Sequence, residues 1–307
     1  MNKTRKNKLY FFHFAILCLL VLGVFQFAEE ILSFKQQLYY ALHPTPEPQE
    51  TVTESLPMEP FLHEEGVWYT NTPLIYHGGG DIDGIALTNS MEAVNATLEK
   101  GHYFIELDFM FTRDGQLVCA HDWERFYPDG YIPTAEEFLS VKIEDRFTPL
   151  SAQSVVTIMR ENPQMHLIID TKEDNLYLVV AELVSLAVQD PEIVDRFIIQ
   201  LYNGYEKPFL NALYPFTDSQ YLLTMYKLGD WDPAILQTCQ VERIFILTTV
   251  AGLIPDEDIP MLRELGFTIY EHTINDPEYA ISSLQRGICG FYTDSMEIDD
   301  LEIPFPD

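Results

Sequence analysis

From residue 73 onward, short apolar segments alternate with longer segments in which apolar residues recur at the spacing of a helix. The short segments have the length of strands, and the longer ones have the periodicity of amphipathic helices. This pattern predicts eight strands, at Leu74–His77, Tyr103–Phe109, His166–Asp170, Arg196–Leu201, Tyr221–Thr224, Arg243–Leu247, Phe267–Glu271 and Gly290–Asp294.

The segments between the strands predict the helices of the domain. Strands that are apolar on both faces and alternate with helices favour a parallel sheet covered on all sides. Eight such units predict an α/β fold, a closed (β/α)8 TIM barrel, with a doubly wound open sheet as the alternative. The predicted helices lie near Ser90–Lys100, Ser151–Arg160, Leu176–Gln189, Glu206–Leu213, Pro233–Thr238, Asp256–Leu265 and Pro277–Arg286.

The N-terminal part has a different pattern. A basic cluster is followed by an apolar run, Leu9–Ala28, that is long enough to cross a bilayer as a helix. We therefore expect a cytoplasmic end and transmembrane anchor at 1–30, an acidic, proline-containing stalk at 31–71 and an extracytoplasmic barrel at 72–307. The barrel would contain an insertion at about 112–148. Secretion after cleavage of a signal peptide is the alternative.

Composition and charge restrict the possible partners. The chain has 307 residues, of which 47% are hydrophobic, and its formal net charge is −30. An acidic surface argues against nucleic acid as a partner, because phosphates require a basic one. The four cysteines are far apart and have no metal-ligand spacing, so we predict no disulfide framework. The oligomeric state stays open.

Three acidic side chains stand at predicted strand ends. Glu106 and Asp108 are two residues apart and point to the same face of their strand. Asp170 ends the next strand, and the C-terminal ends of barrel strands meet at one rim. Three converging carboxylates suit a hard divalent cation, Ca²⁺ or Mg²⁺, with Lys172 as a fixed cation beside it. A purely structural Asp170–Lys172 pair is the alternative.

Two histidines accompany these acids. His77 ends the first strand and precedes Gly78 and Gly79, whose backbone can approach a ligand closely. A turn at Thr112–Gly115 begins a hairpin that returns His121 towards the carboxylates. Two imidazoles with pKa values near neutral can divide the proton transfers of a hydrolysis between them.

Other polar side chains at strand ends are candidates for substrate binding. Gln200 and Asp294 are predicted to contact substrate, although Asp294 could instead cap the following helix. Asp122 is predicted to orient His121 or to cap the turn that follows it. Four other histidines are expected to be structural or exposed: His63, His102, His166 and His272.

These motifs together resemble those of the glycerophosphodiester phosphodiesterases, within the phosphatidylinositol-phospholipase-C-like phosphodiesterase barrels. The resemblance implies a (β/α)8 barrel, catalytic histidines at His77 and His121, and a divalent metal held by acids matching Glu106, Asp108 and Asp170. The motifs that carry it are His77-Gly, Glu106-Leu-Asp108, Thr112-x-Asp114-Gly115-x-Leu-Val-x-x-His121-Asp122 and Phe291-Tyr-Thr-Asp294.

The chain departs from the family pattern at three places. Gly78 stands where the family usually has an arginine, and Thr88 stands where it usually has a glutamate. Asp170 replaces the usual glutamate, and Asp170-x-Lys172 is similar to the pattern of sphingomyelinase-D-like relatives. These departures leave the substrate open while both histidines and all three acids remain.

The sequence therefore predicts a metal-dependent phosphodiester hydrolase of the EC 3.1.4 class that uses two-histidine acid/base catalysis through a cyclic phosphate. Its predicted substrates are glycerophosphodiesters, lysophospholipids or glycerol-phosphate-containing envelope polymers. One alternative is a catalytically inactive, membrane-tethered binding domain. Another is a sphingomyelinase-D-like or phosphoinositide lyase.

Overall fold

The computed structural model describes residues 58–63, 67–172, 176–225 and 230–301. They belong to one compact unit, Pro57–Asp307. The predicted anchor at 1–30 and most of the predicted stalk at 31–71 lie outside the described residues. Within these ranges, no helix combines the length and the apolar character that a membrane span requires.

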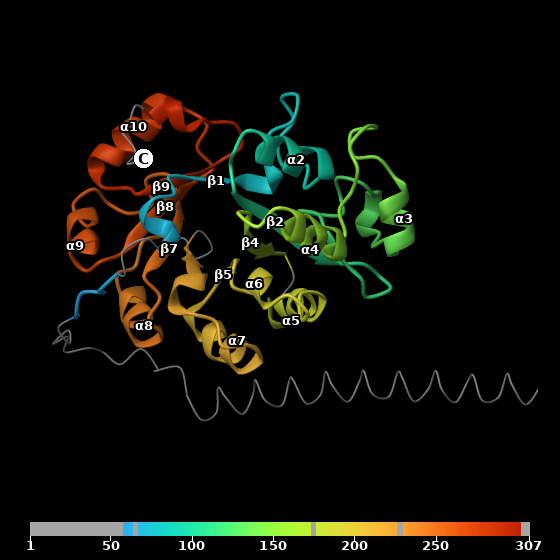
Figure 1. Cartoon of the computed structure of the whole chain (residues 1–307). Coiled ribbons are helices and arrows are strands. Elements are labelled where there is room, and N and C mark those ends of the chain that lie inside the picture. The colour runs from blue at the N-terminus through green and yellow to red at the C-terminus, as the bar shows by residue number, and fades with distance from the viewer. Residues whose placement is uncertain (1–57, 64–66, 173–175, 226–229, 302–307) are drawn as a thin grey trace, which may run out of the picture. The chain divides into compact units, whose positions relative to one another are not determined.

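The strands of the unit form one closed barrel (Figure 1). Its sheet has nine strands. The strand β3 runs antiparallel to β2, and the other eight strands run parallel to one another. Pairing of β1 with β2 through Tyr76 and Ile105 closes the ring, so the predicted (β/α)8 barrel is confirmed. The parallel strands are β1 (Leu74–Tyr76), β2 (Phe104–Phe111), β4 (His166–Thr171), β5 (Phe197–Leu201), β6 (Tyr221–Thr224), β7 (Ile246–Val250), β8 (Thr268–His272) and β9 (Gly290–Thr293).

Helices surround the barrel, and several begin at the residues that the sequence predicts. Ser90 and Ser151 accept hydrogen bonds from backbone N–H groups in the first turns of α2 and α4, and so cap them. The helices are α2 (Met91–Glu99), α3 (Ala135–Ser140), α4 (Ala152–Glu161), α5 (Leu176–Leu186), α6 (Pro191–Val194), α7 (Lys207–Leu213), α8 (Ile235–Glu242), α9 (Ile259–Glu264) and α10 (Pro277–Arg286).

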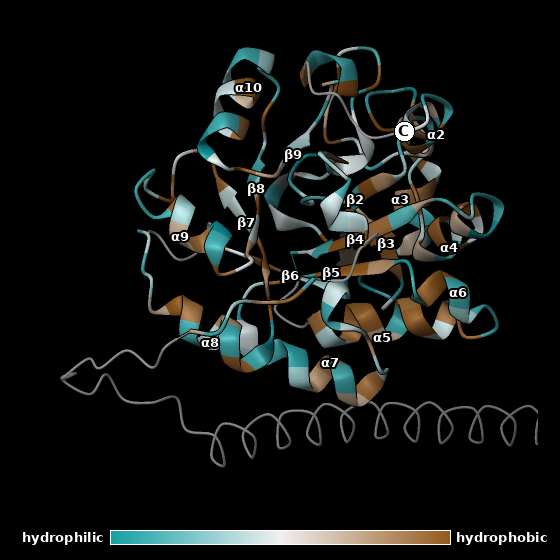
Figure 2. Ribbon diagram, turned by 60° about the vertical axis from the view of Figure 1, so that its left-hand side comes forward, coloured by the Kyte–Doolittle hydropathy of each residue, from teal (hydrophilic) through white to brown (hydrophobic). Residues whose placement is uncertain are grey.

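The hydrophobic core lies between the strands and the helices. Every residue of β5 is buried, as are all but the first residue of β4. Figure 2 shows hydrophobic residues along these strands and hydrophilic residues on the outward turns of the helices. Burial of one large aliphatic side chain contributes about 1.5–3 kcal/mol, so this core fixes the strand ends that carry the site.

The strand predicted at Arg243–Leu247 begins and ends later in the structure. Arg243 has a φ of 53° and forms the C-terminal cap of α8. The strand β7 starts at Ile246 and includes two buried threonines, Thr248 and Thr249. Threonine is β-branched and fits a strand. Because it is polar, however, the apolar pattern stops before Thr248, and the strand was predicted to end at Leu247.

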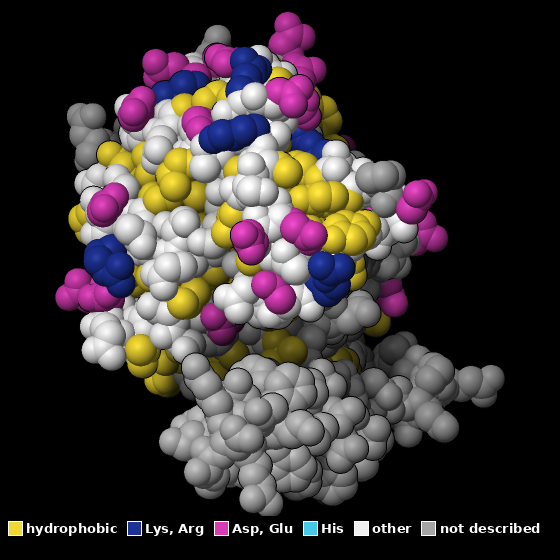
Figure 3. Space-filling view, turned by 90° about the vertical axis from the view of Figure 1, so that its right-hand side faces the viewer, with side chains coloured by type: hydrophobic (Ala, Val, Ile, Leu, Met, Phe, Trp, Pro, Cys, Tyr) yellow, Lys and Arg dark blue, Asp and Glu magenta, His cyan; other side chains and the backbone are white. Residues whose placement is uncertain are grey.

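The predicted insertion at about 112–148 contains its own elements. The strand β3 (Leu117–Cys119) pairs with β2, and α3 follows it. A second apolar cluster, Val118, Ala120, Trp123 and Phe138, packs α3 against the hairpin. Figure 3 shows the face that carries α3, where apolar side chains lie among acidic and basic ones. The hairpin places His121 two residues after the end of β3.

Candidate active site

Three buried carboxylates stand on two neighbouring strands. Glu106 and Asp108 lie on β2, and Asp170 on β4 is in direct register with Asp108. Their residues are 2%, 0% and 4% exposed, respectively. Potential ligand oxygens of all three lie within 4.8 Å of one another. The predicted convergence of the three acids is therefore present in the structure.

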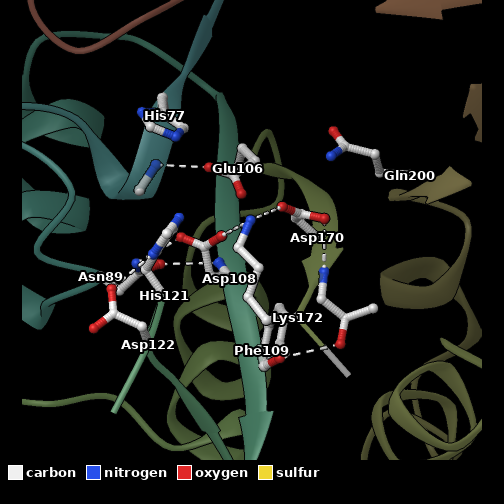
Figure 4. Close-up of polar contacts among 12 residues, drawn as sticks. His77, Asn89, Glu106, Asp108, Phe109, His121, Asp122, Asp170, Lys172 and Gln200 are labelled. Carbon is white, nitrogen blue, oxygen red and sulfur yellow. Dashed lines mark hydrogen bonds and ion pairs between the residues drawn. The ribbon is translucent and has the colours of Figure 1, made fainter. Parts of the chain in front are cut away.

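Lys172 provides the positive charge beside these acids. Its Nζ lies 3.0 Å from Asp108 Oδ1 and 2.7 Å from Asp170 Oδ2 (Figure 4). Burial and the Asp108 charge raise the pKa values of Glu106 and Asp170. Burial alone would also raise the pKa of Asp108, but Lys172 and His121 lower it overall. One ammonium thus balances only part of the negative charge.

Each carboxylate is held by a separate group. The backbone N–H of Gly78 donates to Glu106 Oε2 at 2.7 Å. Two hydrogen bonds of 2.9 Å join Asn89 and Asp108. The Asn89 Nδ2 donates to Asp108 Oδ2, and the Asp108 backbone N–H donates to Asn89 Oδ1. The Tyr202 hydroxyl donates to Asp170. These bonds fix the carboxylate orientations.

His77 lies directly after β1, in the short turn His77–Gly79. Its Nδ1 is 3.0 Å from Asp294 Oδ1. Burial lowers the pKa of His77, but the hydrogen bond to Asp294 and the charges of Glu106 and Asp108 outweigh this and raise it to about 9. The ring therefore favours the protonated form at neutral pH.

His121 reaches the same site from the end of the hairpin. Its Nδ1 is 2.9 Å from Asp122 Oδ2, which leaves Nε2 as the ring nitrogen that can face a substrate. The other oxygen of Asp122 accepts from the Arg125 N–H at 2.8 Å. Asp122 therefore both orients the histidine and caps the turn, the two roles considered for it from the sequence.

The two histidines line one cavity of about 200 Å³ at the C-terminal ends of the barrel strands. Parallel barrels place their chemistry at this end. The cavity brings together most of the predicted site residues with two others. Its lining residues are His77, Glu106, His121, Asp170, Lys172, Gln200, His272 and Tyr292.

Three residues predicted to contact substrate lie outside this lining. Asp294 instead holds His77, and Asn275 donates to its second oxygen at 2.7 Å. The Gly78 N–H is already bonded to Glu106, and the Gly79 carbonyl accepts from the Thr97 hydroxyl at 2.8 Å. The two glycines therefore do not line the cavity; Gly78 holds Glu106, and Gly79 is bonded to Thr97 of α2.

The structure also gives a reason for the missing arginine. Gly78 has a φ of +57°, which disfavours residues with a side chain. A Cβ at this position would lie 2.7 Å from Leu87 Cα. An arginine at position 78 would thus require the loop before α2 to move.

Sequence reasoning missed the roles of three residues. His272 was expected to be structural or exposed, yet it lines the cavity, as does Tyr292. No role was predicted for Asn89 from the sequence. His272 directly follows a predicted strand, so its position at the strand end was the one signal available.

The carboxylate cluster has the chemistry of a site for a divalent cation. Carboxylate oxygens are the ligands that Ca²⁺ and Mg²⁺ prefer. Asp108 Oδ1 is buried and makes no hydrogen bond within the described part of the chain, although it faces Lys172. Glu106, Asp108 and Asp170 therefore fit a bound metal.

Residues 78–127 match the family described as "Glycerophosphoryl diester phosphodiesterase family". The predicted resemblance to this family is confirmed. The matched residues include Glu106, Asp108 and His121, so the expectation of a glycerophosphodiester phosphodiesterase-like hydrolase is also confirmed. No curated protein compared with the chain matches it significantly.

Solved structures of phosphodiesterases share the fold. One is an Oleispira antarctica phosphodiesterase in complex with the product sn-glycerol-3-phosphate, at 15% identity and a TM-score of 0.61; the match covers 73% of this chain and 93% of that one. A Parabacteroides distasonis glycerophosphoryl diester phosphodiesterase has 20% identity, a TM-score of 0.56 and coverages of 73% and 84%. At these identities, the likeness establishes the barrel alone.

Proposed function

We propose that this chain hydrolyses the phosphodiester bond of glycerophosphodiesters or of related lipids and envelope polymers in a metal-dependent reaction. The observation that carries the proposal is the cavity in which His77 and His121 meet the carboxylates and Lys172. Phosphodiester cleavage needs a deprotonated nucleophile, a protonated leaving oxygen and neutralised phosphoryl oxygens. The cavity contains a group for each task.

The two histidines supply the proton transfers. Each ring is oriented through Nδ1 by its own aspartate, Asp294 for His77 and Asp122 for His121. One imidazole accepts the proton of the attacking hydroxyl, and the other, protonated, donates to the leaving alcohol oxygen. Their roles can then reverse when water enters.

Lys172 and the carboxylates act on the phosphate. The Lys172 ammonium lies at the cavity wall and can attract phosphoryl oxygens. A divalent cation held by Glu106, Asp108 and Asp170 would supply further charge neutralisation of these oxygens. Asn89 and Gly78 keep the ligand oxygens in place.

The proposed reaction has two steps. The substrate hydroxyl next to the phosphate attacks phosphorus and loses its proton to one histidine, while the bond to the leaving alcohol breaks and that oxygen gains a proton from the other. A cyclic phosphate results. Water then adds to phosphorus and opens the ring, which gives a phosphomonoester.

The assay uses the full chain with glycerophosphocholine, glycerophosphoglycerol and a lysophospholipid, with and without a chelator. We expect chelator-sensitive hydrolysis. His121→Ala should lower kcat by about 10²- to 10⁴-fold, the usual contribution of general acid/base catalysis. His166→Gln is the matched control, because His166 lies at the opposite end of β4 from Asp170. Activity in His121→Ala equal to that of the control would contradict the proposal.

One observation favours a second candidate, a membrane-tethered binding domain without turnover. The conformation of Gly78 leaves no room for the arginine that the family usually has there. A metal-binding chain that hydrolyses no diester would support this candidate. The Asp170-x-Lys172 pattern also allows a sphingomyelinase-D-like lyase, whose stable product would be the cyclic phosphate instead of the phosphomonoester.

We also propose that residues 1–30 anchor the chain in a membrane with the barrel on the extracytoplasmic side. The apolar run Leu9–Ala28 with basic residues before it supports this. The expressed full chain should sediment with membranes and stay there in high salt, whereas a chain lacking 1–30 should not. A mature N-terminus beyond residue 28 would instead indicate secretion after cleavage.

A further inference from the structure

Three residues that line the cavity, Gln200, His272 and Tyr292, have no role in the proposed reaction. They lie on β5, β8 and β9, and β5 neighbours β4, the strand that carries Asp170. None of the three is a carboxylate, a lysine or an arginine, and together they form an uncharged wall of the cavity. This wall therefore suits the part of the substrate that is not bound through its phosphate.

Gln200 presents hydrogen-bond donors to the cavity. Its residue is 5% exposed, and its side chain extends from β5 towards the space beside Glu106 and Asp170 (Figure 4). The Tyr292 hydroxyl donates to Gln200 Oε1 at 3.0 Å, which fixes the amide orientation. No other hydrogen bond of this side chain occurs within the described residues, so both N–H groups of Nε2 remain for a ligand.

His272 adds a neutral polar group to the same wall. Burial, together with the nearby charges of His77 and Lys172, lowers the pKa of His272 to about 4. Its imidazole is thus uncharged at neutral pH and has one donor nitrogen and one acceptor nitrogen. The ring makes an edge contact with Tyr292, with 6.0 Å between ring centroids.

The chemistry of this wall favours one class of leaving group. Hydroxyl groups can both accept from an amide N–H and exchange hydrogen bonds with a neutral imidazole. A quaternary ammonium group accepts no hydrogen bond and would leave the buried amide unpaired, which is unfavourable. The cavity of about 200 Å³ is also smaller than pockets that enclose large ligands.

We propose that Gln200 and His272, with Tyr292 holding the amide, bind the hydroxyl groups of the leaving alcohol. The site then selects diesters whose leaving alcohol is a small polyol over diesters of choline. This inference rests on the proposed phosphodiesterase function and names the substrate class of that same site.

The test compares glycerophosphoglycerol with glycerophosphocholine as substrates of the full chain. We expect a higher kcat/KM for glycerophosphoglycerol. Gln200→Leu should raise KM for this substrate about tenfold and change kcat much less, while KM for glycerophosphocholine stays within about threefold, because one lost hydrogen bond corresponds to about a tenfold change. His272→Phe keeps an aromatic ring beside Tyr292 and should act in the same direction.

Gln200→Glu is the sharper variant. A glutamate has almost the same shape and still accepts from Tyr292, but it replaces the two N–H donors by a negative charge. The preference should therefore move towards glycerophosphocholine, whose leaving group is cationic. Thermal melting and calorimetric metal titration of each variant separate this effect from misfolding or a changed metal site.

The outcomes distinguish the inference from the function on which it rests. Activity on neither of these substrates nor on the lysophospholipid would overturn the phosphodiesterase proposal itself. Activity without a preference for glycerophosphoglycerol would overturn only the selection of a polyol. Equal losses on both substrates in Gln200→Leu would likewise overturn it, since a structural role affects both alike.

Discussion

Each candidate for proton transfer is a histidine paired with an aspartate. Asp294 holds His77 at 3.0 Å and Asp122 holds His121 at 2.9 Å, so both rings have one nitrogen occupied and one available. The pKa of His77 is raised to about 9 by its partner Asp294 and by the buried acids, against the opposing effect of burial. His77 is therefore available as a protonated group at neutral pH.

Asp294→Asn should move one limb of the pH–rate profile to lower pH. The substitution removes a negative charge beside His77, whose pKa of about 9 should fall towards its ordinary value of 6.5. If His77 is the general acid, the alkaline limb moves; if it is the base, the acidic limb moves. Profiles of kcat/KM measured with saturating metal decide this, and an unchanged profile would contradict the role of Asp294.

The histidines and acids could be predicted from the sequence because they occupy motif positions at strand ends. His272 could not be predicted in this way, because no motif surrounds it and a single histidine at a strand end is more often structural. Tyr292 lies within the motif Phe291-Tyr-Thr-Asp294, but the motif does not indicate that its side chain faces the cavity. Their place in the cavity depends on closure of the barrel, which brings β8 and β9 opposite β4 and β5.

At the scale of elements, the loop between β1 and α2 is as important as the strands. It supplies the Gly78 N–H to Glu106 and the Asn89 side chain to Asp108. Gly78, Leu87 and Asn89 all have positive φ values, between 50° and 57°. The loop is thus a backbone scaffold for the carboxylates, and such conformations cannot be read from hydropathy.

Asn89→Gly should weaken metal binding about 10- to 100-fold, the usual effect of removing a group that orients a ligand. Glycine accepts the positive φ of 50°, so the change removes the amide without adding backbone strain. Calorimetric titration with Ca²⁺ and with Mg²⁺ measures the effect. Unchanged affinity would show that Asp108 needs no support from Asn89.

Gly78→Ala should destabilise the fold more than Gly115→Ala does. Both positions have positive φ, which costs an alanine about 1–2 kcal/mol. Only at position 78 does the added Cβ meet another atom, Leu87 Cα at 2.7 Å, and such overpacking costs about 1–3 kcal/mol more. Urea unfolding of the two variants compares these values, and equal losses would mean that the loop adjusts freely.

At the scale of the whole molecule, the barrel brings buried acids together at one rim. Glu106, Asp108 and Asp170 are among the acidic residues that give the chain its formal net charge of −30. Alternation of strands and helices was enough to predict this architecture. The predicted C-terminal end of the seventh parallel strand, Leu247, was wrong, because the buried threonines of β7 interrupt the hydrophobic pattern there.

The central claim is that a divalent metal bound by Glu106, Asp108 and Asp170 is required for phosphodiester hydrolysis. The most direct test is to strip the full chain with a chelator, remove the chelator, and measure metal binding and glycerophosphodiester hydrolysis in the same titration. The rate should rise in proportion to bound Ca²⁺ or Mg²⁺ and level off when the site is full, and Asp108→Asn should lose both signals. Full activity of the stripped chain, or metal binding that leaves the rate unchanged, would contradict the account.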